Sequence, residues 1–126
     1  MKKEVIIAEN GAPPAGPYSP GIKVGNWLFI SGQAPLDPET KKIPDVFKDQ
    51  VRVTMENVKG IIEAAGGTMD NIVKTTVFLK DMNKFNKMNR VYRKYFTDKP
   101  PARSCVEAAR LPLDIEIEIE AVAYIP

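Results

Sequence analysis

The chain has 126 residues, the length of one ordinary domain, and we expect a single domain over residues 1–126. Hydrophobic residues make up 44% and charged residues 27%, a balance that is typical of globular proteins and argues against disorder. The 18 basic and 16 acidic residues leave a net charge of +2, which argues against binding to nucleic acid or to a membrane through bulk electrostatics.

The first part of the chain predicts a short β-structure interrupted by one loop. Strands are expected at 5–7 and 21–24, on either side of a loop at 10–20 that is rich in Gly, Ala and Pro. Gly25-Asn26 is a turn signal, and the aromatic and apolar residues of 27–33 are typical of a buried strand. These segments predict a hairpin.

A long amphipathic helix is expected at 46–65. Asp45 is a suitable N-cap, and Gly66-Gly67 is a suitable C-terminal stop. Residues at intervals of three and four form the stripe that should face the core: Phe47, Val51, Thr54, Val58, Ile61, Ile62 and Ala65.

The second half predicts another helix between strands. Asp81 or Asn83 can cap this helix, and Pro100 and Pro101 cannot continue it. Its apolar stripe is Phe85, Met88, Val91 or Tyr92, and Tyr95-Phe96. The strands of this half are expected at 72–79, 103–108 and 115–125.

The resulting order, β-β-β-α-β-α-β-β, predicts an α+β domain with a mixed six-stranded sheet and both helices on one face. The other face of such a sheet needs cover, which suggests an oligomer.

Cysteine and histidine usage limits the chemistry. One cysteine excludes an internal disulfide and a structural zinc site, and it fits a reducing compartment. With no histidine, the usual general base and the commonest metal ligand are missing. No apolar run is long enough for a signal peptide or a membrane span, so we expect a cytoplasmic protein.

Arg103 is the first candidate site residue. It follows Pro100 and Pro101, which restrict the path of the chain, and it opens a strand. Its planar guanidinium suits a carboxylate through two parallel hydrogen bonds. The alternative is a surface arginine paired with a neighbouring acid.

Three glutamates, Glu116, Glu118 and Glu120, alternate with isoleucines in the last strand and therefore share one face. We interpret Glu116 and Glu118 as a solvated face. Glu120 precedes the apolar Ala121-Val122-Ala123, so partial desolvation should raise its pKa toward the range of a general base.

Other candidates have weaker individual signals. Cys105 should project to the same strand face as Arg103, but it lacks an activating histidine and suits a packed thiol better. Tyr18 can contact a planar ligand or pack on the surface. Gly32, after Ser31, permits close approach of a ligand or marks a bulge. Asn89, off the apolar stripe, would alone be taken as solvent-facing.

Taken together, six segments resemble the RidA (YjgF) family of reactive-intermediate deaminases, in the family's order over nearly the whole chain. Pro101-Ala102-Arg103-Ser104-Cys105-Val106-Glu107 is the most specific of them. The others are Gly16-Pro17-Tyr18-Ser19, Ile30-Ser31-Gly32-Gln33, Asn57-Val58-Lys59 with Glu63-Ala64-Ala65-Gly66, Val73-Lys74-Thr75-Thr76-Val77-Phe78, and Ile117-Glu118-Ile119-Glu120-Ala121.

This resemblance implies a chorismate-mutase-like fold, a homotrimer with clefts between subunits, and hydrolysis of enamines and imines such as 2-aminoacrylate to a 2-oxo acid and ammonia. It implies that Arg103 binds the substrate carboxylate, that Glu120 positions or activates water, and that Tyr18 closes over the substrate. No cofactor or metal is expected. The pocket would also be lined by Ser31, Gly32, Asn89 and Cys105.

Two other functions stay open at this point. Some relatives have been called ribonucleases or translation inhibitors, although the missing histidine and the balanced charge argue against RNA cleavage here. A module that binds a small 2-oxo acid without turnover would use the same arginine.

Overall fold

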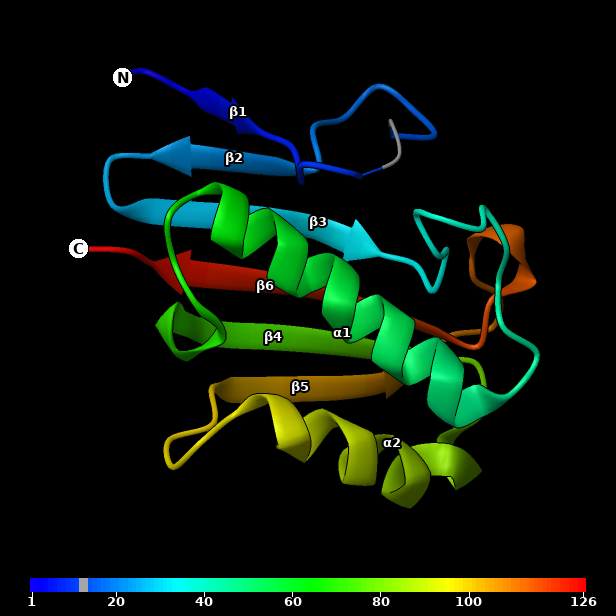
Figure 1. Ribbon diagram of the computed structural model, residues 1–126. Helices are drawn as coiled ribbons and strands as arrows, with labels where there is room; N and C mark the ends of the chain where they lie inside the picture. Colours follow the sequence, from blue (N-terminus) through cyan, green and yellow to red (C-terminus); the bar gives the residue numbers. More distant parts are fainter. Residues whose placement is uncertain (12–13) are drawn as a thin grey trace.

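The computed structural model describes residues 1–11 and 14–126, so residues 12 and 13 of the expected loop lie outside the described residues. Six strands in the described chain form one sheet in the order β1-β2-β3-β6-β4-β5 (Figure 1). Neighbouring strands are antiparallel except β4 and β5, which are parallel. Their bounds are β1 Glu4–Ile6, β2 Gly21–Val24, β3 Trp27–Gln33, β4 Ile72–Leu79, β5 Ala102–Glu107 and β6 Ile117–Tyr124.

The described chain has two α-helices, and both lie on the same face of this sheet (Figure 1). Helix α1, Phe47–Ala64, connects β3 to β4 and packs along the middle of the sheet, against β3 and β6. Helix α2, Phe85–Tyr92, connects the parallel strands β4 and β5. Short 3₁₀ turns precede and follow α2, at Met82–Lys84 and Arg93–Tyr95. Others lie at Met69–Asn71 and Pro112–Asp114.

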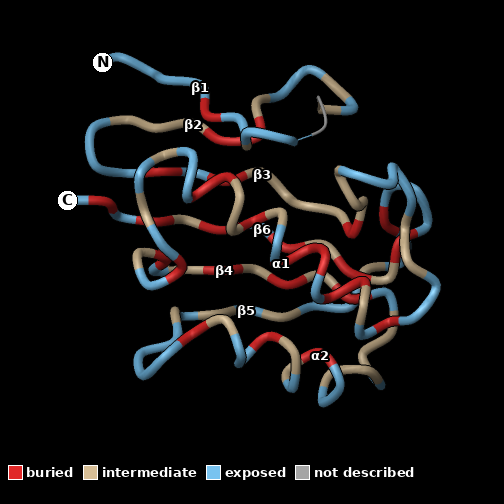
Figure 2. The backbone as a smooth tube through the Cα atoms, in the orientation of Figure 1, coloured by how far each residue is buried: buried red, intermediate tan, exposed pale blue. Residues whose placement is uncertain are grey.

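The core lies between the helices and the central strands. Buried residues recur along β3, β6 and β4 and on α1, whereas β5 has none (Figure 2). Leu28, Val77 and Ile119 supply the sheet side of this core, and Val51 and Ile62 supply the side of α1. The period of two along the strands and the stripe along α1 explain why these residues meet.

The opposite face of the sheet carries exposed apolar side chains. Phe29 stands opposite Val122 in the register, and the side chains of Trp27 and Phe29 are 45% and 50% exposed. The Trp27 and Tyr124 rings make an edge contact with centroids 5.0 Å apart. Both α-helices lie on the other face, so these side chains keep their exposure in the single chain.

The expected order of elements and the α+β class are confirmed, and each strand boundary agrees within two residues. The N-cap expected at Asp45 is wrong: Val46 occupies that position, with no side-chain hydrogen bond to the helix. Asp81 does act as a cap, because its carboxylate accepts a hydrogen bond from the Asn83 backbone N–H at 2.9 Å. The last strand starts at Ile117 because the chain first makes the 3₁₀ turn at Pro112–Asp114.

Candidate functional site

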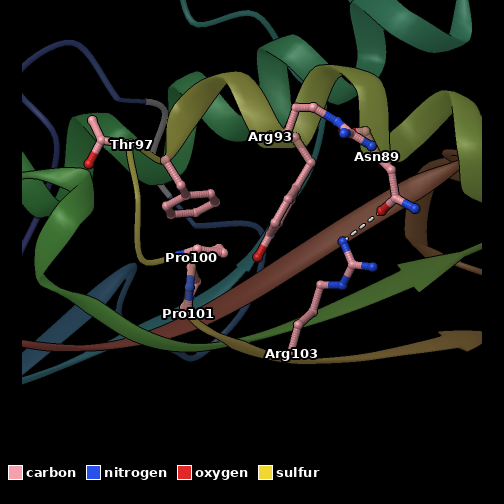
Figure 3. Close-up of a pocket in the computed structure, with 8 residues that line it drawn as sticks. Asn89, Arg93, Thr97, Pro100, Pro101 and Arg103 are labelled. Atoms are coloured by element: carbon pink, nitrogen blue, oxygen red, sulfur yellow. Dashed lines mark hydrogen bonds between the residues drawn. The ribbon is translucent and has the colours of Figure 1, made fainter.

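Arg103 extends from β5 toward α2. In the sheet register it stands opposite Thr75 of β4, a buried residue on the helix-covered face. Its Nη1 donates a hydrogen bond to Oδ1 of Asn89 at 2.8 Å (Figure 3). No carboxylate in the described part of the chain forms an ion pair with Arg103, which argues against the alternative of a surface ion pair.

Two aromatic rings of α2 lie beside this guanidinium. Its carbon is 4.9 Å from the centroid of the Tyr92 ring and 5.4 Å from that of Phe85. Phe85, Asn89 and Tyr92 occupy positions i, i+4 and i+7 of one helix, so they lie on the same side of it. The combination gives Arg103 an amide hydrogen-bond acceptor and aromatic contacts without neutralising its charge.

A cavity of about 500 Å³ opens beside Arg103 (Figure 3). Its walls are mostly apolar and Arg103 is one of two arginines that line it, which suits a small acid with an apolar part. The prolines that precede β5 form one side of the cavity, and residues of α2 and its 3₁₀ extension form the other. The lining residues are Asn89, Tyr92, Arg93, Phe96, Thr97, Pro100, Pro101 and Arg103.

A second group of candidate residues lies around a separate cavity of about 260 Å³, whose lining includes Tyr18, Gly32 and Glu118. A Cβ on Gly32 would stand 2.3 Å from Oε2 of Glu118, so only glycine lets this carboxylate lie against β3. Ser31 fixes the preceding loop, since its hydroxyl donates to the Ser19 carbonyl at 2.6 Å. Glu118 and Tyr18 are thus brought to one cavity from the last strand and from a loop near the start of the chain.

Glu116, just before β6, and Glu118 and Glu120 within it differ from the expectation. Burial, and secondarily the charge of Glu120, raise the pKa of the Glu118 carboxyl above its usual value. Glu120 itself is exposed on the open face, so the expectation that partial burial distinguishes Glu120 is wrong. The expectation of a solvated Glu116 and Glu118 is also wrong, because both are partly buried and Glu116 pairs with Lys84.

Glu118 and Glu120 differ because of residues outside their own strand. Glu118 lies near Gly32, where the pairing of β3 with β6 shifts between Ile30 and Gln33, and it lines the cavity that this irregularity borders. Glu120 stands opposite Thr76 in a regular part of the ladder. Strand alternation alone places both carboxylates on one face and cannot distinguish them.

Cys105 lies on the same side of β5 as Arg103 and is partly buried against the core. Burial raises the pKa of its thiol, and the nearby charge of Arg103 opposes this shift. A raised pKa leaves little thiolate at neutral pH, which agrees with the expected packed thiol and argues against a nucleophile.

Within one chain the candidates form two groups that do not share a cavity. Arg103 and Glu120 stand opposite Thr75 and Thr76, which are consecutive residues of β4, so their side chains point to opposite faces of the sheet. The group on the helix side is Arg103, Asn89 and Cys105. Tyr18, Gly32 and Glu118 line the second cavity and Ser31 precedes Gly32 beside it, whereas Glu120 lines neither cavity.

Residue-by-residue reasoning on the sequence missed the surroundings of Arg103. Tyr92 and Phe85 belong to the expected core stripe of the second helix, and Asn89 falls off that stripe. The spacing of four and three between Phe85, Asn89 and Tyr92 was the available signal, but it becomes informative only when a cation is known to face it.

The residues that the structure describes contain neither a cluster of metal-ligating side chains nor an α-helix able to cross a membrane. Over 1–11 and 14–126, no group of three or more His, Cys, Asp or Glu is placed to hold a metal ion. Neither α-helix in these ranges combines the length and apolar character of a membrane-crossing segment.

Comparison with known proteins identifies the family. The family model described as Endoribonuclease L-PSP matches residues 9–125. A RutC family protein of Pyrococcus horikoshii is 56% identical over 123 residues, which cover 97% of this chain and 98% of the relative. The 2-iminobutanoate/2-iminopropanoate deaminase of Escherichia coli K12 is 48% identical, with coverages of 95% and 96%.

Solved structures agree. Escherichia coli TdcF, determined with bound serine, superposes with a TM-score of 0.94 at 42% identity, covering 98% of this chain and 99% of that one. The YjgF gene product of Escherichia coli gives a TM-score of 0.92 at 47% identity, with coverages of 96% and 98%. The chain belongs to the endoribonuclease L-PSP family, which is the RidA/YjgF family.

Proposed function

We propose that this protein hydrolyses 2-imino acids, together with the 2-enamines that tautomerise to them, to 2-oxo acids and ammonia. The observation that carries the proposal is Arg103, a partly buried cation that has no carboxylate partner in the described chain and lines a largely apolar cavity. The name of the Escherichia coli relative at 48% identity, 2-iminobutanoate/2-iminopropanoate deaminase, supports the same reaction class.

The chemistry needs little beyond positioning. The guanidinium of Arg103 binds the substrate carboxylate, and the protonated imine is already electrophilic at C2. Water adds to C2 as a carboxylate of the protein accepts one of its protons, and the resulting carboxylic acid returns that proton to the nitrogen of the carbinolamine. The C–N bond then breaks to release ammonia as the C=O bond of the 2-oxo acid forms, and the same carboxylate accepts the hydroxyl proton. Placement and one proton relay supply the acceleration, so neither a cofactor nor a metal enters the proposed mechanism.

Two carboxylates compete for the role of water activator. The resemblance to the family motif gives the water-activating role to Glu120, with Tyr18 closing over the substrate. Glu118 fits the geometry better, because it lies in a cavity with Tyr18 and Gly32, and burial raises its pKa, which makes its carboxylate a stronger base. We therefore assign the water-activating role to Glu118 and keep Glu120 as the alternative.

The proposal requires a second copy of the chain. Since Arg103 does not share a cavity with Glu118 or Glu120 in one chain, a neighbouring copy must bring its Tyr18, Gly32 and carboxylate to the Arg103 cavity. We propose a homotrimer with sites between subunits, as the family resemblance implies. The exposed apolar face of the sheet supports such assembly.

The experiment generates 2-iminobutanoate in situ with an amino-acid oxidase and measures its disappearance and the release of ammonia. Arg103→Ala should lower kcat/KM by about 100-fold, as expected for a lost charge-assisted anchor. Arg110→Ala is the matched control, because Arg110 pairs with Asp114 on the surface and should be dispensable. Full activity of Arg103→Ala would refute the proposed binding of the substrate carboxylate by Arg103.

The two glutamates are separated in the same assay. Glu118→Gln should lower kcat by about 100-fold or more, the usual contribution of a positioned general base. The opposite result, with loss confined to Glu120→Gln, would return the role to Glu120. If neither variant loses activity, water activation by this strand is wrong.

Endonucleolytic cleavage of RNA is a second candidate, favoured by the description of the family model. A titration of RNA at two ionic strengths tests it, since binding through phosphates weakens steeply with salt. The binding-module alternative is tested by the imine assay itself, because a module without turnover would bind 2-oxobutanoate but release no ammonia.

A further inference from the structure

The hydroxyl of Tyr92 is fixed in the core beneath Arg103. It lies 2.7 Å from Oγ1 of Thr75, and the two residues are only 5% and 1% exposed. Burial raises the pKa of this phenol, and the opposing effects of Thr75 and Arg103 do not overcome it. The ring is therefore neutral and anchored at its polar end, with the Arg103 guanidinium carbon 4.9 Å from its centroid.

The remaining contacts of Arg103 use only part of its hydrogen-bonding capacity. Nη1 donates to Oδ1 of Asn89 at 2.8 Å and also lies 3.9 Å from Sδ of Met88. Phe85 supplies a second ring at 5.4 Å. Within the described chain, neither Nε nor Nη2 makes a hydrogen bond of good distance and angle, although the guanidinium lies close enough to the Tyr92 hydroxyl to oppose the rise of its pKa. The Nε–Nη2 edge is therefore the pair of parallel donors that remains for a carboxylate.

We propose that Tyr92, anchored by Thr75, is a positioning residue that holds the Arg103 guanidinium with its Nε–Nη2 edge free for the substrate carboxylate. This inference rests on the proposed function for the identity of the ligand. It reassigns Asn89 from a substrate contact to the acceptor that occupies Nη1. A long side chain held in one orientation before binding loses less conformational entropy when the ligand arrives, which strengthens binding.

The competing interpretation is that Tyr92 only fills the core. A core-filling role predicts that its variants change the thermal stability and nothing else. A positioning role predicts in addition that the mobility of Arg103 and its affinity for carboxylates change together.

The mobility is measured without ligand by NMR of the arginine Nε–Hε signals, with the Arg103 signal assigned by its loss in Arg103→Lys. In the wild-type protein we expect a slowly exchanging signal shifted by the ring current. Tyr92→Leu should broaden the signal and move it toward the position of exposed arginines. Tyr92→Phe keeps the ring and should largely restore it.

The affinity is measured by calorimetric titration with 2-oxobutanoate, the product of the proposed reaction. Tyr92→Leu should raise Kd by up to about tenfold, because the freed Arg103 side chain must then be ordered when the ligand binds. Tyr92→Phe and Thr75→Val should each raise Kd by about threefold or less, and the double variant should be no worse than either, because both remove one hydrogen bond.

Tyr95→Phe is the matched control. It also removes a tyrosine hydroxyl near the end of α2, but that hydroxyl donates to Glu56 at 2.7 Å rather than contacting Thr75. Its Kd and the Arg103 signal should stay unchanged. An unchanged Arg103 signal and Kd in Tyr92→Leu, with only the melting temperature lowered, would overturn the proposal.

These readouts separate the inference from the proposed function. If the wild-type protein binds 2-oxobutanoate and shows the constrained Arg103 signal but hydrolyses no imine, the proposed enzymatic function is wrong and the positioning role of Tyr92 stands. If the wild-type protein hydrolyses the imine but its Arg103 signal shows a mobile side chain, the enzymatic function stands and the positioning role of Tyr92 is wrong.

Discussion

At the scale of single residues, Glu118 links the proposed chemistry to stability. Its carboxyl has a raised pKa in the folded chain because burial and Glu120 disfavour its charge. The group therefore costs no stability below its unfolded pKa, near 4.5, and destabilises the fold increasingly as the pH rises through the folded pKa. We predict that Glu118→Gln is more stable than the wild type at pH 8, by less than about 1 kcal/mol because the group keeps contact with solvent. The difference in unfolding free energy between the variant and the wild type should disappear near pH 4. Thermal unfolding at both pH values and one protein concentration tests this, and a difference that is the same at both would contradict it. The residue scale is also where the sequence alone was weakest. Arg103 could be found from the prolines before it and from its motif, whereas Glu118 and Glu120 have equivalent positions in the alternation and differ only through the irregular pairing of β3 with β6.

At the scale of elements, the first turn of α1 lacks a side-chain cap. Val46 occupies the N-cap with extended backbone angles (φ −82°, ψ 128°), which are the angles of a capping residue, but valine offers no acceptor. We predict that Val46→Ser stabilises the protein by about 1 kcal/mol, because its hydroxyl can accept a hydrogen bond from a free N–H of the first turn. Asp45→Ala, at the neighbouring position first expected to cap this helix, should change the free energy of unfolding by only a few tenths of that amount. Chemical denaturation of both variants measures the difference, and an equal effect of the two would show that the cap is misplaced. The stripe from Phe47 to Ile62 was predictable because its period is set by local geometry, and so was the C-terminal end before Gly66. The residue at the N-cap was not, because capping depends on which backbone groups the preceding loop leaves free.

At the scale of the whole molecule, the uncovered face of the sheet and the separation of the candidate site residues into two groups both require a second copy of the chain. Phe29 and Trp27 lie half exposed on a face that neither α-helix covers, and the Arg103 cavity lies apart from Glu118 and Tyr18. Neighbouring copies that cover that face would bury its apolar area, and those that also reach the edge strand β5 would complete the site beside Arg103. We predict that the wild type is an oligomer in light scattering after size exclusion, and that Phe29→Glu dissociates it, because each subunit would bring an unpaired charge into the interface. The dissociated variant should lose imine hydrolysis although Arg103 is untouched. Val46→Glu is the matched control, since Val46 is 52% exposed at the start of a helix and its variant should stay assembled and active. An assembled and active Phe29→Glu protein would show that another surface forms the contact, whereas an active monomer would show that one chain completes the site by itself.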